Sequence, residues 1–185
     1  ASRYTGHSDL LPPGEKIADA RDPKWRKELE LEKFKLKQLD VAFVIDSTGS
    51  MGPCVRWIQN DVVRMMRAFE LISREPRIGV TLYRDYGDDY VVHPIPLSDR
   101  AEVLAAALRG ATARGGGDIP EAVHCGLLVA ARTYRWSGPE ARKVVVLMGD
   151  APPHRRELQP LEQLVGQGVR RGFLFYAVKV RSRYR

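Results

Sequence analysis

Apolar residues along the chain follow two alternating patterns, short uninterrupted runs and longer stretches with helical spacing. The runs are rich in β-branched and aromatic side chains, which predicts strands that are buried on both faces. The strands that they predict span residues 39–45, 77–83, 143–148 and 173–180. The helical spacing predicts amphipathic helices at residues 55–69, 103–108, 120–131 and 160–169. This alternation predicts an α/β fold of the Rossmann-like, doubly wound type, with a mostly parallel sheet and helices on both faces.

One further strand, at residues 91–97, contains Pro94 and Pro96. Because proline has no N–H to donate to a neighbouring strand, this strand is predicted at an edge of the sheet. The acidic turn at residues 85–89 makes an antiparallel hairpin the simplest connection to the preceding strand. The sheet is therefore predicted to include one antiparallel edge strand.

The short helix at residues 103–108 is predicted to begin after a cap at Ser98 or Asp99 and to end at Gly110. Its inward-facing residues are predicted to be Val103, Leu104, Ala107 and Leu108.

The N-terminal part of the chain has a different composition. Residues 1–22 contain Pro12, Pro13 and Gly14 among scattered polar groups, which is typical of an extended arm or linker. From Pro23 the charge density rises and acidic residues precede basic ones, which favours a helix that leads into the first strand. We therefore divide the chain into an N-terminal arm with a charged helical segment, residues 1–38, and one α/β domain, residues 39–185.

The first buried strand ends in a series of oxygen-bearing side chains, DSTGS at residues 46–50. Asp46, Thr48 and Ser50 alternate in this loop, so one carboxylate and two hydroxyls can turn toward one point beyond the strand. Hard divalent cations such as Mg²⁺ prefer ligands of this kind. The alternative is that Asp46 caps a helix and the hydroxyls only stabilise a turn.

Two more loops bring carboxylates to the same end of the predicted sheet. Asp150 follows the run at residues 143–148, and Asp118 and Glu121 flank Pro120, which is predicted at the first position of a helix. Ligands of open α/β sheets bind beyond the carboxyl ends of the strands, so we expect these loops to converge with Asp46. The alternative for Asp118 and Glu121 is that they are carboxylates favoured at a helix N-terminus.

The three loops, in this order, resemble the metal-ion-dependent adhesion site of von Willebrand factor type A domains, whose first loop reads Asp-x-Ser-x-Ser. Thr48 replaces the first of these serines and keeps its hydroxyl. The resemblance covers roughly residues 39–180. It implies that Thr48 and Ser50 bind the ion directly, and that Asp46 and Asp150 bind it directly or through water. The implied cation is Mg²⁺, with Mn²⁺ or Ca²⁺ as alternatives.

The second loop departs from the commonest family pattern. Many members have a threonine after two glycines, where this chain has Gly117 followed by Asp118. The sequence DIPE at residues 118–121 is instead similar to the corresponding loop in the A-like domains of integrin β chains, in which an acidic residue after proline reaches the ion. By these resemblances Glu121 and Asp118 are both candidate ligands. The family usually adds one more helix after the last strand, so we expect a continuation beyond Arg185 or a truncated boundary there.

The net charge of +7 is concentrated near the C-terminus. Residues 141–185 contain ten Lys and Arg against three Asp and Glu, whereas the rest of the chain is nearly balanced. No zinc spacing, recognition-helix pattern or aromatic interleaving accompanies this charge, so we expect no nucleic acid partner. No apolar run approaches the roughly 20 residues that span a bilayer, so we expect no membrane insertion. The cysteines, Cys54 and Cys125, are expected to be free buried thiols.

The resemblance implies a protein-binding module, used for adhesion or as a scaffold within a larger polypeptide, rather than an enzyme. A partner protein would complete the coordination of the cation with an Asp or Glu. The alternative is a metal-dependent phosphoryl-transfer or hydrolytic enzyme with Asp46 as nucleophile, although such enzymes usually have a second Asp where Thr48 stands. A third possibility is an A domain that serves assembly without metal. Near the site, we expect Arg84 to pair with Asp85, and His154 to lie at the loop surface.

Overall fold

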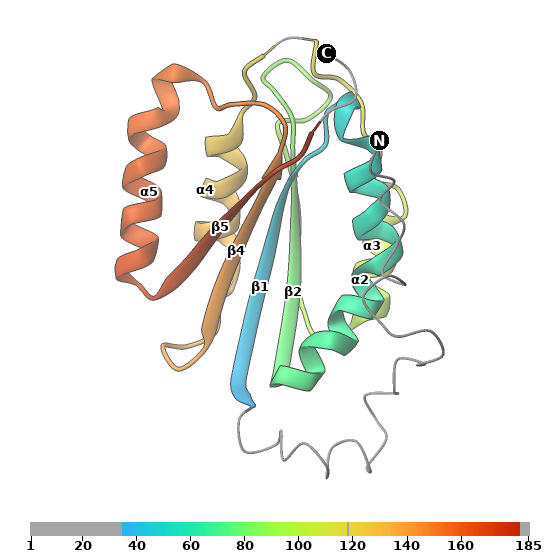
Figure 1. The fold of residues 1–185 in the computed structure, drawn as a ribbon, viewed down its shortest axis with the longest axis vertical. Helices are drawn as coiled ribbons and strands as arrows, with labels where there is room; N and C mark the ends of the chain where they lie inside the picture. Colours follow the sequence, from blue (N-terminus) through green and yellow to red (C-terminus); the bar gives the residue numbers. More distant parts are fainter. Residues whose placement is uncertain (1–34, 118, 182–185) are drawn as a thin grey trace.

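The computed structural model describes residues 35–117 and 119–181. Its strands form one sheet in the order β3-β2-β1-β4-β5 (Figure 1). The strands are β1 (Leu36–Asp46), β2 (Ser73–Tyr83), β3 (Val92–Ser98), β4 (Arg142–Gly149) and β5 (Phe173–Lys179). All neighbours pair in parallel except β2 and β3, which are antiparallel. The predicted mostly parallel sheet with one antiparallel edge strand is confirmed.

Helices cover both faces of the sheet, as predicted. Helices α2 (Gly52–Ile72) and α3 (Ala101–Leu108) lie on one face, and α4 (Val123–Thr133) and α5 (Leu158–Arg170) lie on the other (Figure 1). Two short 3-10 helices, η3 (Gly49–Met51) and η4 (Arg155–Glu157), precede α2 and α5. Helix α2 buries residues at intervals of three and four along one side, which are Val55, Ile58, Val62 and Met66. This spacing is the physical basis of the predicted amphipathic helix.

Strand β1 is the centre of the fold. Every residue from 39 to 48 is buried, because β2 and β4 flank the strand and helices cover both of its faces. Phe43 and Ile45 belong to the hydrophobic cluster beneath α2, whereas Ala42 and Val44 belong to the cluster that includes residues of α4 and α5. The uninterrupted apolar run in the sequence thus corresponds to a strand buried on both faces.

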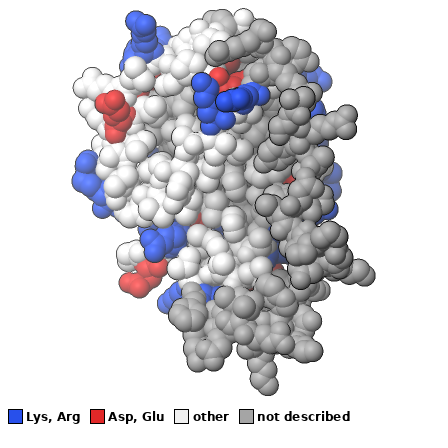
Figure 2. All heavy atoms as spheres, in the orientation of Figure 1, with Lys and Arg blue, Asp and Glu red and all other residues white. Residues whose placement is uncertain are grey.

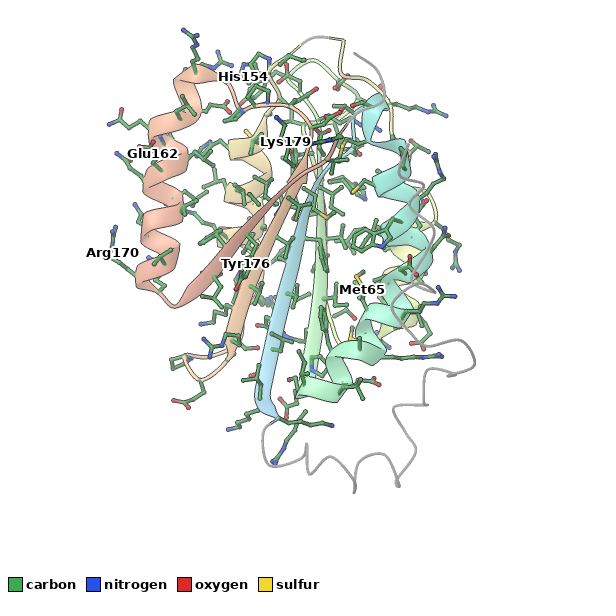
Figure 3. All side chains as sticks on the ribbon, viewed as in Figure 1. Met65, His154, Glu162, Arg170, Tyr176 and Lys179 are labelled. Carbon is green, nitrogen blue, oxygen red and sulfur yellow. The ribbon has the colours of Figure 1, made fainter. Side chains whose placement is uncertain are left out.

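The sheet is less well covered on the α2 side of β4 and β5. Leu174, Tyr176 and Val178 alternate along β5 and are all exposed. On the face that Figure 2 shows, the central region is uncharged and most charged side chains lie toward the margins. Figure 3 labels Tyr176 in this region. Among the described residues, α2 and α3 therefore cover mainly the half of this face formed by β1, β2 and β3.

Helix α2 ends at Ile72, before Pro76, and extends beyond the predicted residues 55–69. Strand β2 begins at once at Ser73, earlier than the predicted residue 77. The predicted start of the short helix is wrong. The short helix α3 begins after Arg100, without a side-chain cap at Ser98 or Asp99.

Helix α3 also buries fewer residues than predicted. It buries Leu104 and Leu108, while Val103 and Ala107 are exposed. The reason is that only a narrow stripe of α3 packs against its neighbours, and two residues four positions apart fill that stripe.

The helix predicted from Pro120 begins at Val123, because Glu121 is extended and pairs with Pro153 in an isolated β-bridge. The predicted arm and charged helix lie in residues 1–34, outside the described residues, apart from residues 35–38. Of these last residues, Leu36 to Gln38 already belong to β1.

The order in which strands are added to the sheet reverses between β1 and β4, which are themselves parallel. From β1 the chain continues outward to β2 and β3, whereas β4 and β5 extend the sheet on the opposite side. The loops that follow β1 and β4 therefore diverge to opposite faces at the carboxyl ends of these strands. Open α/β sheets bind their ligands at this position.

Candidate metal centre

The first loop folds around the side chain of Asp46, the last residue of β1. Asp46 is fully buried, and its Oδ1 accepts hydrogen bonds from the Thr48 backbone N–H at 2.9 Å and from the Thr48 hydroxyl at 2.7 Å. The Thr48 hydroxyl thus donates a hydrogen bond to Asp46, and its oxygen lone pairs remain available as acceptors. Asp46 Oδ2 has no hydrogen-bond partner among the described residues. One oxygen of this carboxylate is therefore held in place, and the other is not engaged.

The electrostatic environment of Asp46 disfavours its negative charge. Burial raises the pKa of Asp46 from 3.8 to about 6, against the lowering effect of the two hydrogen bonds from Thr48. The negative charges of Asp150 and Asp88 raise it further. A cation bound at this carboxylate would reverse the effect, because a nearby positive charge favours the ionised form.

The second loop packs directly onto the first. Gly49 N donates to Gly115 O at 3.1 Å, and Arg114 N donates to Ser47 O at 3.1 Å. Gly116 has a φ of +74°, and a Cβ added there would lie 2.6 Å from Thr48 Cβ and 3.1 Å from Glu121 Oε1. Only glycine fits this close approach.

A backbone hydrogen bond holds Glu121, in the second loop, close to the third loop. Its N–H donates to Pro152 O at 3.0 Å, so the third loop fixes the position of the second. Glu121 is buried, and its Oε1 lies against Gly116, as Thr48 does. The other candidate of this loop, Asp118, lies outside the described residues.

The third loop begins at Gly149, beside Asp46. A Cβ added at Gly149 would lie 2.7 Å from the Tyr83 hydroxyl oxygen and 3.6 Å from Asp46 Oδ2. Asp150 follows, half-buried, and its charge acts on both Asp46 and Tyr83. Ser50 is half-buried in η3.

The structure therefore brings Asp46, Thr48, Glu121 and Asp150 to one end of the sheet, with Ser50 in the adjoining turn. No three His, Cys, Asp or Glu side chains of residues 35–117 and 119–181 form a metal-binding group by themselves. A cation here would depend on the hydroxyls of Thr48 and Ser50 as well as on carboxylates. Such mixed oxygen ligands suit Mg²⁺, which also keeps waters.

Sequence reasoning missed Asp88, which lies in the loop between β2 and β3. Its Oδ2 accepts from Gly116 N at 3.2 Å and from Asp85 N at 3.3 Å, and its charge contributes to the raised pKa of Asp46. The sequence identified this acidic stretch only as a hairpin turn. The signal that could have revealed Asp88 is the parallel pairing of β1 with β2, which places the loops that follow them side by side.

Two expectations about neighbouring residues are wrong. Asp85 does not pair with Arg84. It contacts His154, whose Nε2 lies 2.6 Å from Asp85 Oδ1, so His154 is tied to the β2–β3 loop. Arg84 instead donates to Thr112 O at 2.8 Å and lies 4.1 Å above the Tyr90 ring, with Asp89 at 3.4 Å. The cause in each case is a contact between loops that are distant in the sequence.

The two cysteines are free, as expected. Cys54 is buried in the first turn of α2, and burial together with the charge of Asp46 raises the pKa of its thiol to about 11. Cys125 is only half-buried, which differs from the expectation, and its Sγ lies 3.1 Å from the Tyr86 hydroxyl.

A model of the von Willebrand factor type A domain family matches residues 40–184. The chain is similar to the mouse protein vitrin (27% identity, 66% of this chain and 18% of vitrin). It is also similar to the alpha-protein kinase vwkA of Dictyostelium discoideum (27% identity, 76% of this chain and 24% of the kinase). A third relative is a protein of Acanthamoeba polyphaga mimivirus named as an ariadne-like RING finger protein (28% identity, 64% of this chain and 11% of that protein).

The chain thus spans at most about a quarter of the length of these curated relatives. Among solved structures, it matches the pilus adhesin SpaC from Lactobacillus rhamnosus GG with a TM-score of 0.48 and 18% identity, over 63% of this chain and 15% of the adhesin. Because the family model matches well over half of its residues, the chain belongs to the von Willebrand factor type A domain family.

Proposed function

We propose that this domain binds a partner protein through a divalent cation held at the candidate metal centre. Domains of this family are typically protein-interaction and adhesion domains, and they often bind a divalent metal. The cation ligands would be Asp46, Thr48, Ser50, Asp150 and an acidic residue of the second loop. An Asp or Glu of the partner would complete the coordination.

One observation carries this proposal, the unengaged oxygen of Asp46. A buried carboxylate oxygen without a partner is costly, because burial removes its water and nothing replaces it. The site has no Lys or Arg hydrogen-bonded to Asp46 among the described residues, and Thr48 occupies only Oδ1. A cation at Oδ2 would compensate both the missing hydrogen bonds and the negative charges of Asp150 and Asp88.

The residues around Asp46 fit a hard cation. They offer carboxylate and hydroxyl oxygens, which is the ligand class of Mg²⁺, with Mn²⁺ or Ca²⁺ as alternatives. In the second loop, Glu121 Oε1 and the Thr48 side chain both lie against Gly116, which supports the candidacy of Glu121. Asp118 remains the other candidate for this position.

The proposed role of the cation is to make an acidic partner residue the anchor of the interface. An exposed ion pair in water contributes about 1 kcal/mol or less. A partner carboxylate that binds the cation directly is desolvated and pre-oriented, and contacts of this kind can dominate an interface. Binding should therefore be lost when the cation is removed.

The test is thermal unfolding of the whole chain in EDTA, then in excess Mg²⁺ and in excess Mn²⁺. At a concentration 100 times its dissociation constant, an ion that binds only the folded state adds about 2.7 kcal/mol of stability. Asp46→Ala should remove this gain. Asp61→Ala, at an acidic residue of α2 paired with Arg64, is the matched control and should keep the gain. If neither ion stabilises the native chain, the proposal fails.

The enzyme alternative predicts a different result. If Asp46 were a nucleophile, the native chain would hydrolyse a phosphoester such as p-nitrophenyl phosphate in Mg²⁺, and Asp46→Ala would not. The full burial of Asp46 opposes this role, since a substrate must reach the nucleophile. We expect no hydrolysis by either protein.

A further inference from the structure

An exposed tyrosine and an arginine form a defined feature beside the candidate metal centre. The Tyr86 side chain belongs to the β2–β3 loop and is 43% exposed, although its hydroxyl is anchored. That hydroxyl donates to Glu157 Oε1 at 2.5 Å. The guanidinium of Arg156 lies 5.2 Å from the centre of the Tyr86 ring, within cation–π distance. We call Tyr86 and Arg156 together the Tyr86 patch.

Tyr86, the tyrosine of the Tyr86 patch, is held in place by neighbouring side chains. Glu157 is only 6% exposed, and Cys125 Sγ lies 3.1 Å from the same tyrosine hydroxyl. The ring centre of His154 lies 5.4 Å from that of Tyr86, and His154 is itself fixed by Asp85. A side chain that is already immobile loses little conformational entropy on binding. Tyrosine and arginine are also the residue types enriched at the energetic centres of interfaces.

The Tyr86 patch lies at the carboxyl edge of the sheet, on the same loops that build the candidate centre. Tyr86 follows β2 by three residues, and Arg156 lies six residues after Asp150. Figure 3 shows His154 at this end of the molecule, near the top of α4 and α5. A partner segment with a residue at the cation would therefore pass close to Tyr86.

The Tyr86 ring, unlike its hydroxyl, has no evident role in packing. The residue is absent from both hydrophobic clusters, and its ring faces solvent while its hydroxyl points inward. A tyrosine that served only to satisfy Glu157 would not need an exposed ring with a cation over it. The exposed ring and guanidinium offer an apolar surface and a positive charge side by side.

We infer that the Tyr86 patch recognises residues that flank the partner's cation-binding carboxylate. The Tyr86 ring would contact an apolar side chain, and Arg156 would pair with a second acidic residue. Arg155, exposed in the same short helix, adds positive charge on this side. This inference rests on the proposed function and names the partner more closely, as an acidic segment of a protein with an apolar residue beside its anchoring Asp or Glu.

Charge favours a protein partner over a nucleic acid. An exposed aromatic ring with an arginine can also stack a nucleotide base. However, Asp88 and Asp150 lie half-buried in loops at this end of the sheet, and their charges would repel a phosphate backbone. A peptide with two or three isolated carboxylates can place each one on a cation or an arginine.

The experiment uses the whole chain and a displayed library of twelve-residue peptides, each with a fixed central Glu and randomised flanks. Peptides are selected in Mg²⁺ and eluted with EDTA. We expect enrichment of an apolar residue and an additional Asp or Glu near the central Glu. Arg156→Glu should weaken the selected peptides about tenfold and change the preferred flanking charge to positive. Tyr86→Ala should remove the apolar preference.

Matched controls come from exposed residues elsewhere in the sheet. Arg142→Glu makes the same charge reversal at the amino end of β4, and Tyr176→Ala removes an exposed tyrosine from β5. Neither should change the selected peptides. Arg156 is exposed, so Arg156→Glu should lower the unfolding temperature only slightly, through the loss of its contact with the Tyr86 ring. This variant tests the inference if Tyr86→Ala is unstable.

The outcomes separate this inference from the proposed function. If Mg²⁺-dependent peptides have the same flanks with native and Arg156→Glu protein, the Tyr86 patch is not the recognition surface, while the proposed function stands. If the selected peptides bind Asp46→Ala as tightly as they bind the native protein, both fail. If no peptide is enriched, this inference fails, and the thermal unfolding test with Mg²⁺ and Mn²⁺ decides the proposed function. Binding of a single-stranded oligonucleotide that Arg156→Glu abolishes would overturn the assignment to an acidic peptide.

Discussion

Two aspartates of β1, Asp40 and Asp46, are both fully buried and yet have opposite surroundings. Asp40, near the amino end, receives hydrogen bonds on both oxygens, from Arg77 Nε and Nη2 at 2.8 Å each and from Ser137 N at 2.7 Å. Asp46, at the carboxyl end, uses only Oδ1. Hydrogen bonds within the protein satisfy both oxygens of Asp40 but only one oxygen of Asp46.

The two carboxyl groups also titrate in opposite directions. Burial alone would raise the pKa of Asp40, but the hydrogen bonds from Arg77 and Ser137 outweigh it and hold the pKa below 3.8. For Asp46, burial outweighs the hydrogen bonds from Thr48 and raises the pKa to about 6. Equal burial therefore does not imply an equal role. Asp40 ties elements of the fold together, whereas Asp46 is the residue that we propose to bind a cation.

The largest expected change in stability comes from replacing Asp40. Asp40→Ala should lower the free energy of unfolding by about 3 to 5 kcal/mol, because it leaves the charge of Arg77 without its buried partner. Urea unfolding monitored by circular dichroism measures this loss. Asp61→Ala removes the exposed pair with Arg64 and should cost about 1 kcal/mol or less. A similar small loss in both variants would show that Asp40 is not a structural tie.

The next effect is a pH dependence that differs in sign between the two aspartates. Without cations, the folded state holds the Asp46 proton more tightly than the unfolded state. Stability from this group is therefore full below pH 3.8 and falls as the pH rises to about 6, by roughly 3 kcal/mol for a shift of about two pKa units. Asp40 acts oppositely, since its contribution is present above pH 3.8 and is lost as the pH falls through its lowered pKa.

Urea unfolding in EDTA between about pH 2 and pH 7 measures both contributions, that of Asp40 below pH 3.8 and that of Asp46 above it. Asp46→Asn should flatten the fall between pH 4 and pH 6, and saturating Mg²⁺ should flatten it in the native chain. An unchanged slope in Asp46→Asn would assign the pH dependence to other groups and would remove the contrast between the two aspartates.

Much of the fold could be predicted from the sequence because its signals are local. The apolar run around Phe43 and Val44 determines a central strand, and Pro94 and Pro96 determine an edge strand, whatever the rest of the chain does. The pair of Asp40 and Arg77 could also have been found. Each precedes an apolar run by one residue, and the parallel register of β1 and β2 places them opposite each other.

The candidate site was predictable only in part, because many of its contacts join residues that are distant in the sequence. The contact between Asp46 and Thr48 lies within one short turn, so the motif at residues 46–50 contains it. The contacts of Asp88 with Gly116 and of Asp85 with His154 join loops 28 and 69 residues apart. No periodicity specifies how such loops meet, because their positions follow from the assembled sheet.

Gly116 tests whether the second loop shapes the surroundings of Asp46. Gly116→Ala should cost about 1 to 3 kcal/mol, since an alanine at a φ of +74° is strained and its Cβ would lie 2.6 Å from Thr48 Cβ. The displaced Thr48 should also weaken Mg²⁺ binding in a calorimetric titration. Gly138→Ala, where no atom lies within 4 Å of the added Cβ, is the control and should change neither quantity. Normal Mg²⁺ affinity in Gly116→Ala would mean that the two loops are independent at the centre.

The smallest effect on stability separates two serines of the first loop, and it sharpens the contrast between structural and ligand-directed groups. The Ser47 hydroxyl donates to Tyr83 O at 2.9 Å and lies 2.9 Å from the Tyr90 hydroxyl, so Ser47→Ala should cost about 1 kcal/mol of stability and leave Mg²⁺ affinity unchanged. Ser50→Ala should change stability in EDTA by less than about 0.5 kcal/mol, because Ser50 is half-buried in the short turn η3. Its Mg²⁺ affinity should fall by about tenfold or more, since a direct ligand matters at least as much as a group that only orients one. Equal Mg²⁺ affinity in the two variants would remove Ser50 from the proposed ligands and leave the cation to Asp46, Thr48 and the carboxylates of the other two loops.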